Sequence, residues 1–382
     1  MQEKVKLILD ELEKTFSYRD ILPMRHDKNF IYVGDKRLVN FSSNDYLGIA
    51  QSKHFTKKFF DQLDLHRIPP SSSSSRILTG SFEIFERFEY FLQHLYAPKK
   101  ALLFNSGYHA NMGAIDCLAR ISNTLFLTDS SMHASVFDGL RISHARFKRF
   151  AHNNMQDLGV LLEKYHREYD HIVILSEGIF SMDGDVCDIK QLVEFKKQYP
   201  NVLLYIDEAH SIGTYGKNLL GVCKNANLIE MVDFLILGFG KAIGSSGGCV
   251  ICDDVFRKYF INKARTLIYS TAMAPTNIAF SLFVFQNLLH FKPQQKKLLK
   301  LAKFLKQGLR DKNIDFIGDV HIICLMTYDN KKTLELSQKL FDKGFFAPAI
   351  RFPSVPENQS RIRISLTANL TQQNITNLLE CL

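Results

Sequence analysis

The sequence predicts an α/β protein, with a mainly parallel central sheet and a smaller α+β domain at the C-terminal end. Between about residues 81 and 275, short apolar runs alternate with segments whose apolar residues recur at helical spacing. Strands that alternate with helices indicate βαβ units around a buried parallel sheet. After about Pro275 the pattern changes to long helical stretches followed by short strands and helices. We therefore expect three parts: an N-terminal helix and hairpin segment (1–45), a large domain (46–275) and a small C-terminal domain (276–382).

The composition narrows the class of protein. A chain of 382 residues with 46% hydrophobic and 23% charged residues is typical of a soluble globular protein with a large core. The sequence has no run of 18 apolar residues, so no transmembrane helix is expected. Four acidic residues (Glu3, Asp10, Glu11 and Glu13) interrupt the region where a signal peptide would be apolar. The seven cysteines are scattered and odd in number, which favours reduced thiols and a cytoplasmic protein.

The net charge of +9 does not point to nucleic acid. The basic residues are dispersed, and the lysines between 296 and 306 recur at helical spacing, as on a solvated helix face. No nucleic-acid-binding motif is present. A mildly basic surface would suit an acidic substrate or carrier. Cys249 and Cys252 have the spacing of a metal or redox pair, but their apolar surroundings favour a buried strand, and no second Cys/His pair lies nearby.

The first elements are a helix and a hairpin. Apolar residues at helical spacing predict an amphipathic helix over 1–16. A Gly34-Asp35 turn between two strand-like runs predicts a hairpin over 30–41. A polar loop, 42–48, leads into the large domain. The serine run 71–75 has the composition of a linker, but it is too short to separate two domains.

The alternating region begins with a helix for which Ser81 is the expected N-cap. Further helices are expected from Tyr108 and His133. The expected strands are 101–104, 124–127, 171–175, 202–206, 234–237 and 249–251, and the C-terminal helices are 277–292, 295–310 and 370–381. Ligands of such sheets bind at the carboxyl ends of the strands, so the chemistry is expected just after each strand.

Lys241 follows one of these strands. The run Leu235–Gly244 carries it on a turn among glycine and alanine residues, which would give a ligand close access. A lysine at the mouth of a sheet is a candidate Schiff-base nucleophile. A solvated surface lysine on a tight turn is the alternative for this segment taken alone.

Three other strand ends carry polar residues. Ser106-Gly107 opens a helix and could bind phosphate through backbone N–H groups, although it is neither a Walker loop nor Gly-x-Gly-x-x-Gly, and an ordinary helix start explains it equally well. His133 could stack on a ligand or cap a helix. Glu177, with Asp183 and Asp185 after it, could suggest a metal, but the spacing favours turn and capping carboxylates.

Asp207 ends the strand 202–206 and is expected to be nearly buried, so it needs a cationic partner. In a pyridoxal phosphate enzyme that partner is the protonated pyridine nitrogen, and His210 could reach the phenolic oxygen of the ring. A Walker B aspartate is the rival interpretation, but no Walker A accompanies it. Asp207, a lysine 34 residues later and an upstream phosphate turn are together the parts of a pyridoxal phosphate site.

These motifs resemble those of the α-oxoamine synthases, pyridoxal phosphate enzymes of the aspartate-aminotransferase fold (fold type I of the PLP-dependent transferases). The resemblance covers essentially the whole chain. The family signatures are Asn40–Gly48, Glu177–Asp185, Asp207–His210 and Phe239–Lys241, and the stretches that discriminate among its members are Arg149–Asn153, Ile268–Thr271 and Ala349–Pro356. The resemblance implies a decarboxylative condensation of L-alanine with a pimeloyl thioester, carried by coenzyme A or acyl carrier protein.

The resemblance also implies the roles of the central residues. Lys241 would hold pyridoxal phosphate and later move the Cα proton of the amino acid. Asp207 would pair with the pyridine nitrogen and His210 with the phenolic oxygen. His133 would stack on the ring face and contact the substrate.

The phosphate would be held by several polar groups. The resemblance implies the Ser106 turn, the backbone amides of Gly107 and Tyr108, and Ser181. Thr271 would reach the phosphate of the partner subunit's cofactor, which implies a homodimer with shared active sites.

The substrate would be bound by a further set of residues. By resemblance, Arg363 and Asn44 would bind the carboxylate of the amino acid through charge-assisted hydrogen bonds. Arg19 and Ser354 match substrate-contacting positions.

The chain departs from the family pattern at two places. Gly238 lies where relatives often have Ser or Thr beside the phosphate, so we expect one hydrogen bond fewer there. The usual glycine-rich segment is replaced by the serine run 71–75, and the histidine after it by Phe82 or Phe85, which bears on acyl-chain specificity.

Alternative functions are another α-oxoamine synthase (glycine C-acetyltransferase, 5-aminolevulinate synthase or a longer-chain aminoketone synthase), a fold-related aminotransferase, and a non-catalytic binding protein.

Overall fold

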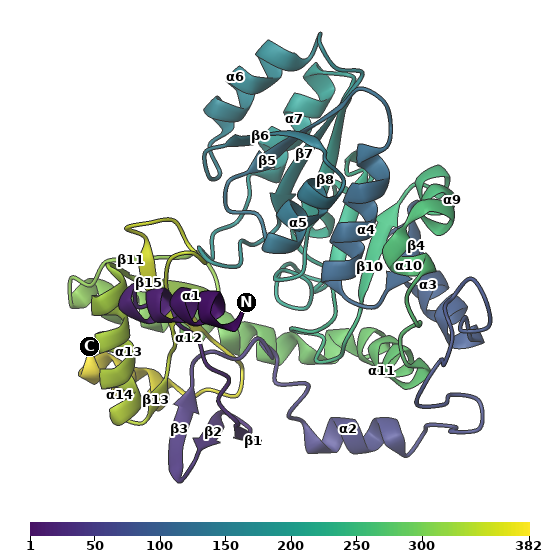
Figure 1. Ribbon diagram of the computed structural model, residues 1–382. Helices are drawn as coiled ribbons and strands as arrows, with labels where there is room; N and C mark the ends of the chain where they lie inside the picture. The colour runs from purple at the N-terminus through teal and green to yellow at the C-terminus, as the bar shows by residue number, and fades with distance from the viewer. The chain divides into compact units, whose positions relative to one another are not determined.

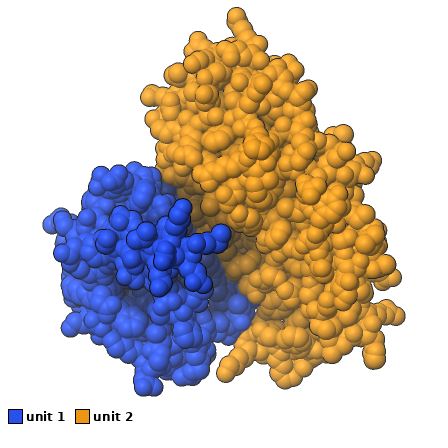
Figure 2. All heavy atoms as spheres, in the orientation of Figure 1, with its two compact units in different colours: residues 1–51, 182–185, 294–382 blue, residues 52–181, 186–293 orange.

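The computed structural model describes all residues, 1–382. The chain forms two compact units (Figures 1 and 2). The larger unit comprises residues 52–181 and 186–293, and the smaller unit comprises 1–51, 182–185 and 294–382. The expected division at 45/46 and 275/276 stays a prediction about domains, since these compact units begin and end elsewhere. In particular, residues 1–51 belong to the same unit as the C-terminal part of the chain.

The larger unit is built on a seven-stranded sheet in the order β4-β10-β9-β8-β7-β5-β6. The strands are β4 (Lys100–Phe104), β5 (Thr124–Asp129), β6 (Arg146–Phe150), β7 (His171–Glu177), β8 (Val202–Asp207), β9 (Phe234–Gly238) and β10 (Gly248–Cys252). Strands β6, β5, β7, β8 and β9 pair in parallel, whereas β10 is antiparallel to both β4 and β9. The predicted mainly parallel α/β sheet is confirmed. Strand β6 was not predicted, because its sequence RFKRF is mostly charged, as suits an exposed edge strand.

Helices precede, connect and follow the strands of this sheet (Figure 1). They are α2 (Lys53–Phe60), α3 (Glu83–Leu95), α4 (Gly107–Ala119), α5 (Ala134–Ile142), α6 (Met155–Tyr165), α7 (Ile189–Gln198), α8 (Val222–Asn225), α9 (Asp254–Lys263), α10 (Arg265–Ile268) and α11 (Pro275–Gln286), with 3₁₀ turns at Ile229–Met231 and Leu288–Phe291. The expectation that Ser81 caps α3 is wrong. The N-cap is Phe82, which makes no side-chain cap bond. The Ser81 hydroxyl accepts instead from Arg76, 3.3 Å away.

The serine run 71–75 is an ordered part of the larger unit. The Ser72 hydroxyl is buried and donates to the Met273 carbonyl at 2.7 Å. The Ser74 carbonyl accepts from the Ala272 N–H at 2.8 Å. These two bonds attach the run to the segment just after Thr271, so it is no linker.

The smaller unit holds two four-stranded sheets. One has the order β1-β2-β3-β13 and the other β11-β12-β15-β14. Their strands are β1 (Arg25–Asp27), β2 (Phe30–Val33), β3 (Lys36–Asn40), β11 (Phe316–Ile317), β12 (Ile322–Tyr328), β13 (Phe345–Phe346), β14 (Ala349–Ile350) and β15 (Ser360–Ser365). The hairpin predicted over 30–41 is β2–β3. Since β3 pairs with β13, the N-terminal segment is joined to the C-terminal part by backbone hydrogen bonds.

The helices of the smaller unit are α1 (Gln2–Lys14), α12 (Lys292–Asp311, within this unit from residue 294), α13 (Asn330–Asp342) and α14 (Gln372–Cys381). Helix α1 forms as predicted, but none of its residues is buried. No helix of the chain combines the length and the hydropathy required to cross a bilayer.

Candidate active site

Asp207 is held at the carboxyl end of β8. Its side chain is buried, with only 6% of the residue exposed. One carboxylate oxygen accepts from the Asn111 side-chain amide at 2.8 Å, and the other from the Ala209 N–H at 2.9 Å. Asn111, on α4, also donates to the Ser135 hydroxyl and accepts from the Tyr205 hydroxyl at 2.7 Å. The orientation of Asp207 is therefore fixed by neutral donors.

Asn111 is a functional candidate that the sequence interpretation missed. It lies four residues after Gly107, which is one turn of α4 beyond the phosphate-turn candidate. That spacing was a usable signal, because a helix that begins at the site returns to the same face at i+4.

His133 lies between β5 and α5 and is half-buried. It is the N-cap of α5, and its Nδ1 accepts from the Ser135 N–H at 3.2 Å. Burial lowers the pKa of its imidazole, Asp207 acts in the opposite direction, and the charge of Lys241 lowers the pKa again. His133 thus caps a helix and also lies within the electrostatic reach of Asp207 and Lys241. A neutral imidazole in that place can lie flat on an aromatic ring.

Glu177, the last residue of β7, also belongs to this group. Its carboxyl is almost fully buried, with 2% of the residue exposed. One oxygen accepts from the His133 N–H at 2.7 Å, and the other from the Ser181 N–H at 3.2 Å. Burial raises its pKa well above the usual range, Asp207 raises it further, and Lys241 lowers it. These two bonds to backbone N–H groups agree with the capping and turn role that the sequence predicts for Glu177.

The phosphate-turn candidate follows β4. The Ser106 hydroxyl caps α4 by accepting from the His109 N–H at 3.1 Å. The first two N–H groups of the helix, from Gly107 and Tyr108, have no intrahelical partner, because helix geometry provides none. The Tyr108 side chain is exposed and donates to Asp138 at 2.6 Å. Backbone donors at a helix N-terminus suit a phosphate group.

Two glycines keep the surroundings of this turn open. A Cβ on Gly248 would lie 2.6 Å from the Gly107 nitrogen, so β10 approaches the turn as closely as backbone atoms allow. A Cβ on Gly238, at the end of β9, would lie 2.9 Å from the Cβ of Ala209. A serine or threonine at position 238 would therefore require Ala209 to shift.

Lys241 follows β9 on a turn closed by the bond from the Gly244 N–H to its carbonyl, at 2.9 Å. The residue is half-buried rather than solvated. Its charge acts on the titration of both His133 and Glu177, which places it in the same group. The surface-lysine alternative is not what the fold presents.

Three more predicted residues lie in the larger unit. Ser181 and His210 are buried, and His210 accepts from the Thr214 hydroxyl through its carbonyl. Thr271 is exposed, and its carbonyl accepts from the side chain of Asn105, the residue before Ser106, at 2.7 Å. Thr271 is thus attached to the phosphate turn through Asn105.

These residues fit pyridoxal 5′-phosphate. A buried carboxylate with two neutral donors, Asp207, suits a cationic ring nitrogen. The helix N-terminus at Gly107 suits the phosphate, and the half-buried amine of Lys241 suits covalent attachment. The carboxylate, the helix N-terminus and the amine all lie at the same edge of the sheet, at or just after the carboxyl ends of β8, β4 and β9 respectively.

The smaller unit carries the residues expected to bind the amino acid. Arg363, on β15, is buried and donates to the Ser365 hydroxyl at 2.6 Å and to Asn44 at 3.5 Å. The Tyr46 hydroxyl donates to the same Asn44 oxygen at 3.0 Å. The fold thus brings Arg363 and Asn44 together, and it adds Tyr46, which the sequence interpretation did not single out.

His321 packs against Tyr46, with ring centroids 4.1 Å apart. Burial and the charge of Arg363 lower its pKa to about 3. Arg363 is therefore accompanied by a neutral ring.

Arg19 and Ser354 also lie in the smaller unit. The Arg19 guanidinium donates to the Ser354 hydroxyl at 2.5 Å. Nearby, Arg351 donates to the carbonyls of Phe16 and Tyr18. The segments 16–19 and 351–354 are held together by these bonds, so the two predicted substrate positions are neighbours.

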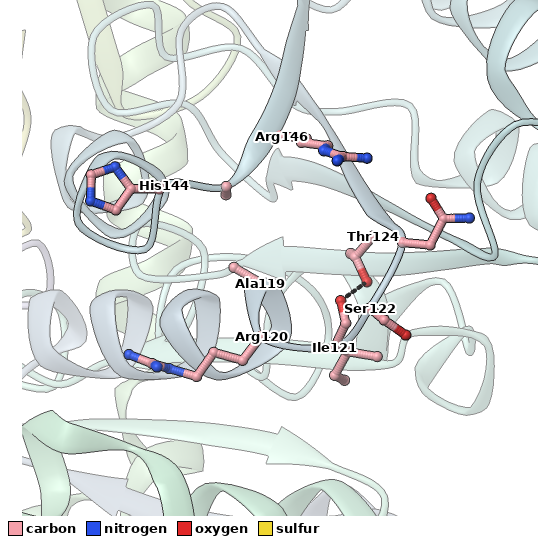
Figure 3. A pocket seen from close by; sticks show the side chains of 9 residues that line it. Ala119, Arg120, Ile121, Ser122, Thr124, His144 and Arg146 are labelled. Atoms are coloured by element: carbon pink, nitrogen blue, oxygen red, sulfur yellow. Dashed lines mark hydrogen bonds between the residues drawn. The ribbon is translucent and has the colours of Figure 1, made fainter.

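Other features carry no comparable arrangement. A hollow beside the start of β5 is lined by Arg120, His144 and Arg146. The side chains of Arg120 and Arg146 extend in opposite directions (Figure 3), and Arg120 pairs with Asp116. Asp183, one of the carboxylates considered for a metal, pairs with Arg361 at 2.6 Å. Cys249 and Cys252 lie buried in β10, as the strand interpretation predicted.

Comparison with known proteins decides the family. A family model for class I and II aminotransferases matches residues 36–382. The chain belongs to this family. Within it, a protein of Haemophilus influenzae (strain 86-028NP) named "Putative 8-amino-7-oxononanoate synthase" is 40% identical over 98% of this chain and 98% of its own length. A protein of Neisseria gonorrhoeae (strain NCCP11945) with the same name is also 40% identical, again over 98% of both chains.

Solved structures share this fold. A serine palmitoyltransferase from Sphingomonas wittichii has a TM-score of 0.90 at 24% identity, covering 99% of this chain and 96% of that one. An 8-amino-7-oxononanoate synthase from Francisella tularensis has a TM-score of 0.76 at 23% identity, covering 90% and 96%. A structure described as SPT with PLP has a TM-score of 0.90 at 25% identity, covering 100% and 97%. The chain is an enzyme of fold type I that uses pyridoxal 5′-phosphate, and the resemblance to α-oxoamine synthases is confirmed.

Proposed function

We propose that the chain is an 8-amino-7-oxononanoate synthase, a decarboxylating C-acyltransferase of biotin biosynthesis that condenses L-alanine with a pimeloyl thioester. The observation that carries the proposal is 40% identity over nearly the full length with relatives of that name. The arrangement around Asp207, His133 and Lys241 supports it, because those groups are what the chemistry requires.

Each residue has a proposed part. Bound pyridoxal phosphate supplies the electron sink that stabilises negative charge at the Cα of the amino acid. Asp207, oriented by Asn111, keeps the ring nitrogen protonated, and His210 hydrogen-bonds the phenolic oxygen. His133 covers the ring face. Lys241 holds the cofactor and, once released, its Nζ takes the Cα proton.

The remaining residues bind the phosphate and the substrates. The turn Ser106–Tyr108 and Ser181 bind the phosphate, with Gly238 contributing backbone only. Arg363 and Asn44 bind the carboxylate of L-alanine, and Arg19 and Ser354 contact the substrate.

A decarboxylation assay tests the specific activity. The purified protein, loaded with pyridoxal phosphate, is given L-alanine with pimeloyl-coenzyme A or with pimeloyl-acyl carrier protein, and CO2 release is measured. We expect release with at least one of the two carriers, and loss of both the visible band of the bound cofactor and the activity in Lys241→Ala. Release only with glycine and acetyl-coenzyme A would refute the specific assignment but not the family.

A second candidate, a longer-chain α-oxoamine synthase, is favoured by one observation. The serine palmitoyltransferase structure has a higher TM-score (0.90) than the 8-amino-7-oxononanoate synthase structure (0.76). Both likenesses are below 25% identity and concern the fold, so the 40% identical relatives outweigh them. Including L-serine and palmitoyl-coenzyme A in the same assay separates the two candidates.

We also propose a homodimer with shared active sites, in the cytoplasm. The seven cysteines are all unpaired thiols, as in reducing compartments. If Thr271 serves the partner subunit's cofactor, mixing Lys241→Ala subunits with Thr271→Ala subunits creates dimers with one intact site. Recovery of activity on mixing is therefore expected, and no recovery would contradict shared sites.

A further inference from the structure

Glu177 connects two loops that carry cofactor residues. Its two carboxyl oxygens are divided between them, one on the His133 N–H at 2.7 Å and one on the Ser181 N–H at 3.2 Å. His133 begins α5 after β5, whereas Ser181 follows β7, so the two loops are far apart in sequence. A single buried side chain thus sets the separation between the residue proposed for the ring face and the residue proposed for the phosphate.

The position of Glu177 in the sheet directs it into the cofactor site. Glu177 and Asp207 are register partners on the parallel strands β7 and β8. Register partners of neighbouring strands project to the same face of a sheet. The Glu177 carboxyl is therefore a close neighbour of the carboxylate expected to pair with the ring nitrogen, and the charges of both Asp207 and Lys241 act on it.

Glu208 provides an instructive contrast. It too is a buried glutamate, directly after strand β8, and its two carboxyl oxygens accept backbone N–H groups, from Val222 at 2.9 Å and Cys223 at 2.7 Å. Those N–H groups begin α8, which carries no cofactor residue. Two carboxyls of the same type therefore differ in what they hold, one a structural helix and the other the two loops of the site.

We propose that Glu177 is a positioning residue of the pyridoxal phosphate site, which holds the His133 loop and the Ser181 loop at the separation that the bound cofactor requires. The proposal depends on the cofactor and not on alanine or pimeloyl thioester as substrates, so it stands or falls separately from the proposed reaction.

The test compares Glu177→Gln with the matched control Glu208→Gln. Glutamine keeps the shape and one acceptor, but its NH₂ group faces a backbone N–H, so one loop is released. Apoprotein of each variant is titrated with pyridoxal phosphate, followed by circular dichroism in the visible band of the bound cofactor. We expect Glu177→Gln to bind the cofactor about tenfold or more weakly, as for an unsatisfied buried donor, and with an altered visible dichroism. Glu208→Gln is expected to lower the Tm while leaving both cofactor readouts unchanged.

The same titration can overturn the proposal. If folded Glu177→Gln binds pyridoxal phosphate with wild-type affinity and wild-type dichroism, Glu177 acts only in stability and the proposal is wrong. Glu177→Asp keeps the carboxyl group but is one methylene short of reaching both loops, so an intermediate loss of affinity is expected. This variant serves if the glutamine variant does not fold. Failure of both variants to fold would equally refute a role specific to the cofactor.

Discussion

Replacing Asn111 by alanine tests how Asp207 is oriented. The substitution removes the 2.8 Å hydrogen bond to the Asp207 carboxylate and leaves the buried Tyr205 hydroxyl without its acceptor. A hydrogen bond to a charged group contributes about 1.5–3 kcal/mol. If that contribution is realised only when Asp207 is aligned with the ring nitrogen, the affinity for pyridoxal phosphate falls about 10- to 150-fold.

The assay uses the cofactor's own signal. The chain contains no tryptophan, so the visible absorbance and dichroism of bound pyridoxal phosphate are a better probe than protein fluorescence. Apoprotein of the wild type and of Asn111→Ala is titrated with pyridoxal phosphate, and a Kd is fitted for each.

The control is Tyr205→Phe, which removes the bond on the other side of Asn111. It leaves a buried acceptor unpaired, so the free energy of unfolding is expected to fall by about 1–3 kcal/mol. The contact from Asn111 to Asp207 remains, so the Kd for the cofactor is expected to change less than about threefold, by the same reasoning. Equal Kd values for wild type and Asn111→Ala would show that Asp207 does not depend on Asn111.

Three further predictions follow from packing and charge. Gly238→Thr is expected to destabilise the fold by about 1–3 kcal/mol through contact with the Ala209 Cβ, and adding Ala209→Gly should restore the Tm and then tighten cofactor binding; unchanged cofactor affinity in the double variant would refute the missing-hydroxyl argument. The pKa of His321, lowered to about 3 from 6.5, makes its contribution to stability complete above about pH 6.5 and lost as the pH falls toward 3. Between pH 7 and 5 wild type should therefore lose about 2 kcal/mol more than His321→Phe in urea unfolding, and parallel curves would contradict this. Tyr46→Phe should raise the KM for the amino acid about fivefold, by loss of about 1 kcal/mol from the Asn44 contact, without changing the Kd for pyridoxal phosphate; an unchanged KM would show that Tyr46 does not position Asn44.

The strands of the large sheet, and the candidate residues at their carboxyl ends, could be predicted from the sequence because a buried parallel sheet has apolar strands. The apolar runs within 171–175 and 202–206 identify β7 and β8, and the carboxylates just after them, Glu177 and Asp207, are then the candidates. Strand β6 could not be predicted, since a charged edge strand has no apolar signature. The joining of residues 1–51 to the C-terminal part depends on β3–β13 pairing between positions about 300 residues apart, which no local pattern contains.

Only part of the candidate site could be predicted from the sequence. Asp207 ends strand β8 and Lys241 follows strand β9, and a carboxylate or an amine in such a place is a candidate by its residue type alone. Asn111 and Tyr46 contact the candidate residues Asp207 and Asn44, so they become candidates only when hydrogen-bond partners are known. Glu177 was read as a turn carboxylate, which is correct for its bonds but omits which two loops those bonds hold.

Strand β10 carries no side chain that we assign to the chemistry, yet its first residue pairs with the last residues of both β4 and β9. Gly248 is the register partner of Phe104 on one side and of Gly238 on the other. Phe104 and Gly238, the residues from which the phosphate turn and the lysine turn begin, are therefore separated by two inter-strand spacings, about 9.6 Å, with one glycine between them. A slip of β10 by a single residue would displace both turns at once, so mutational tolerance in this strand is limited by the cofactor even though the strand does not react with it.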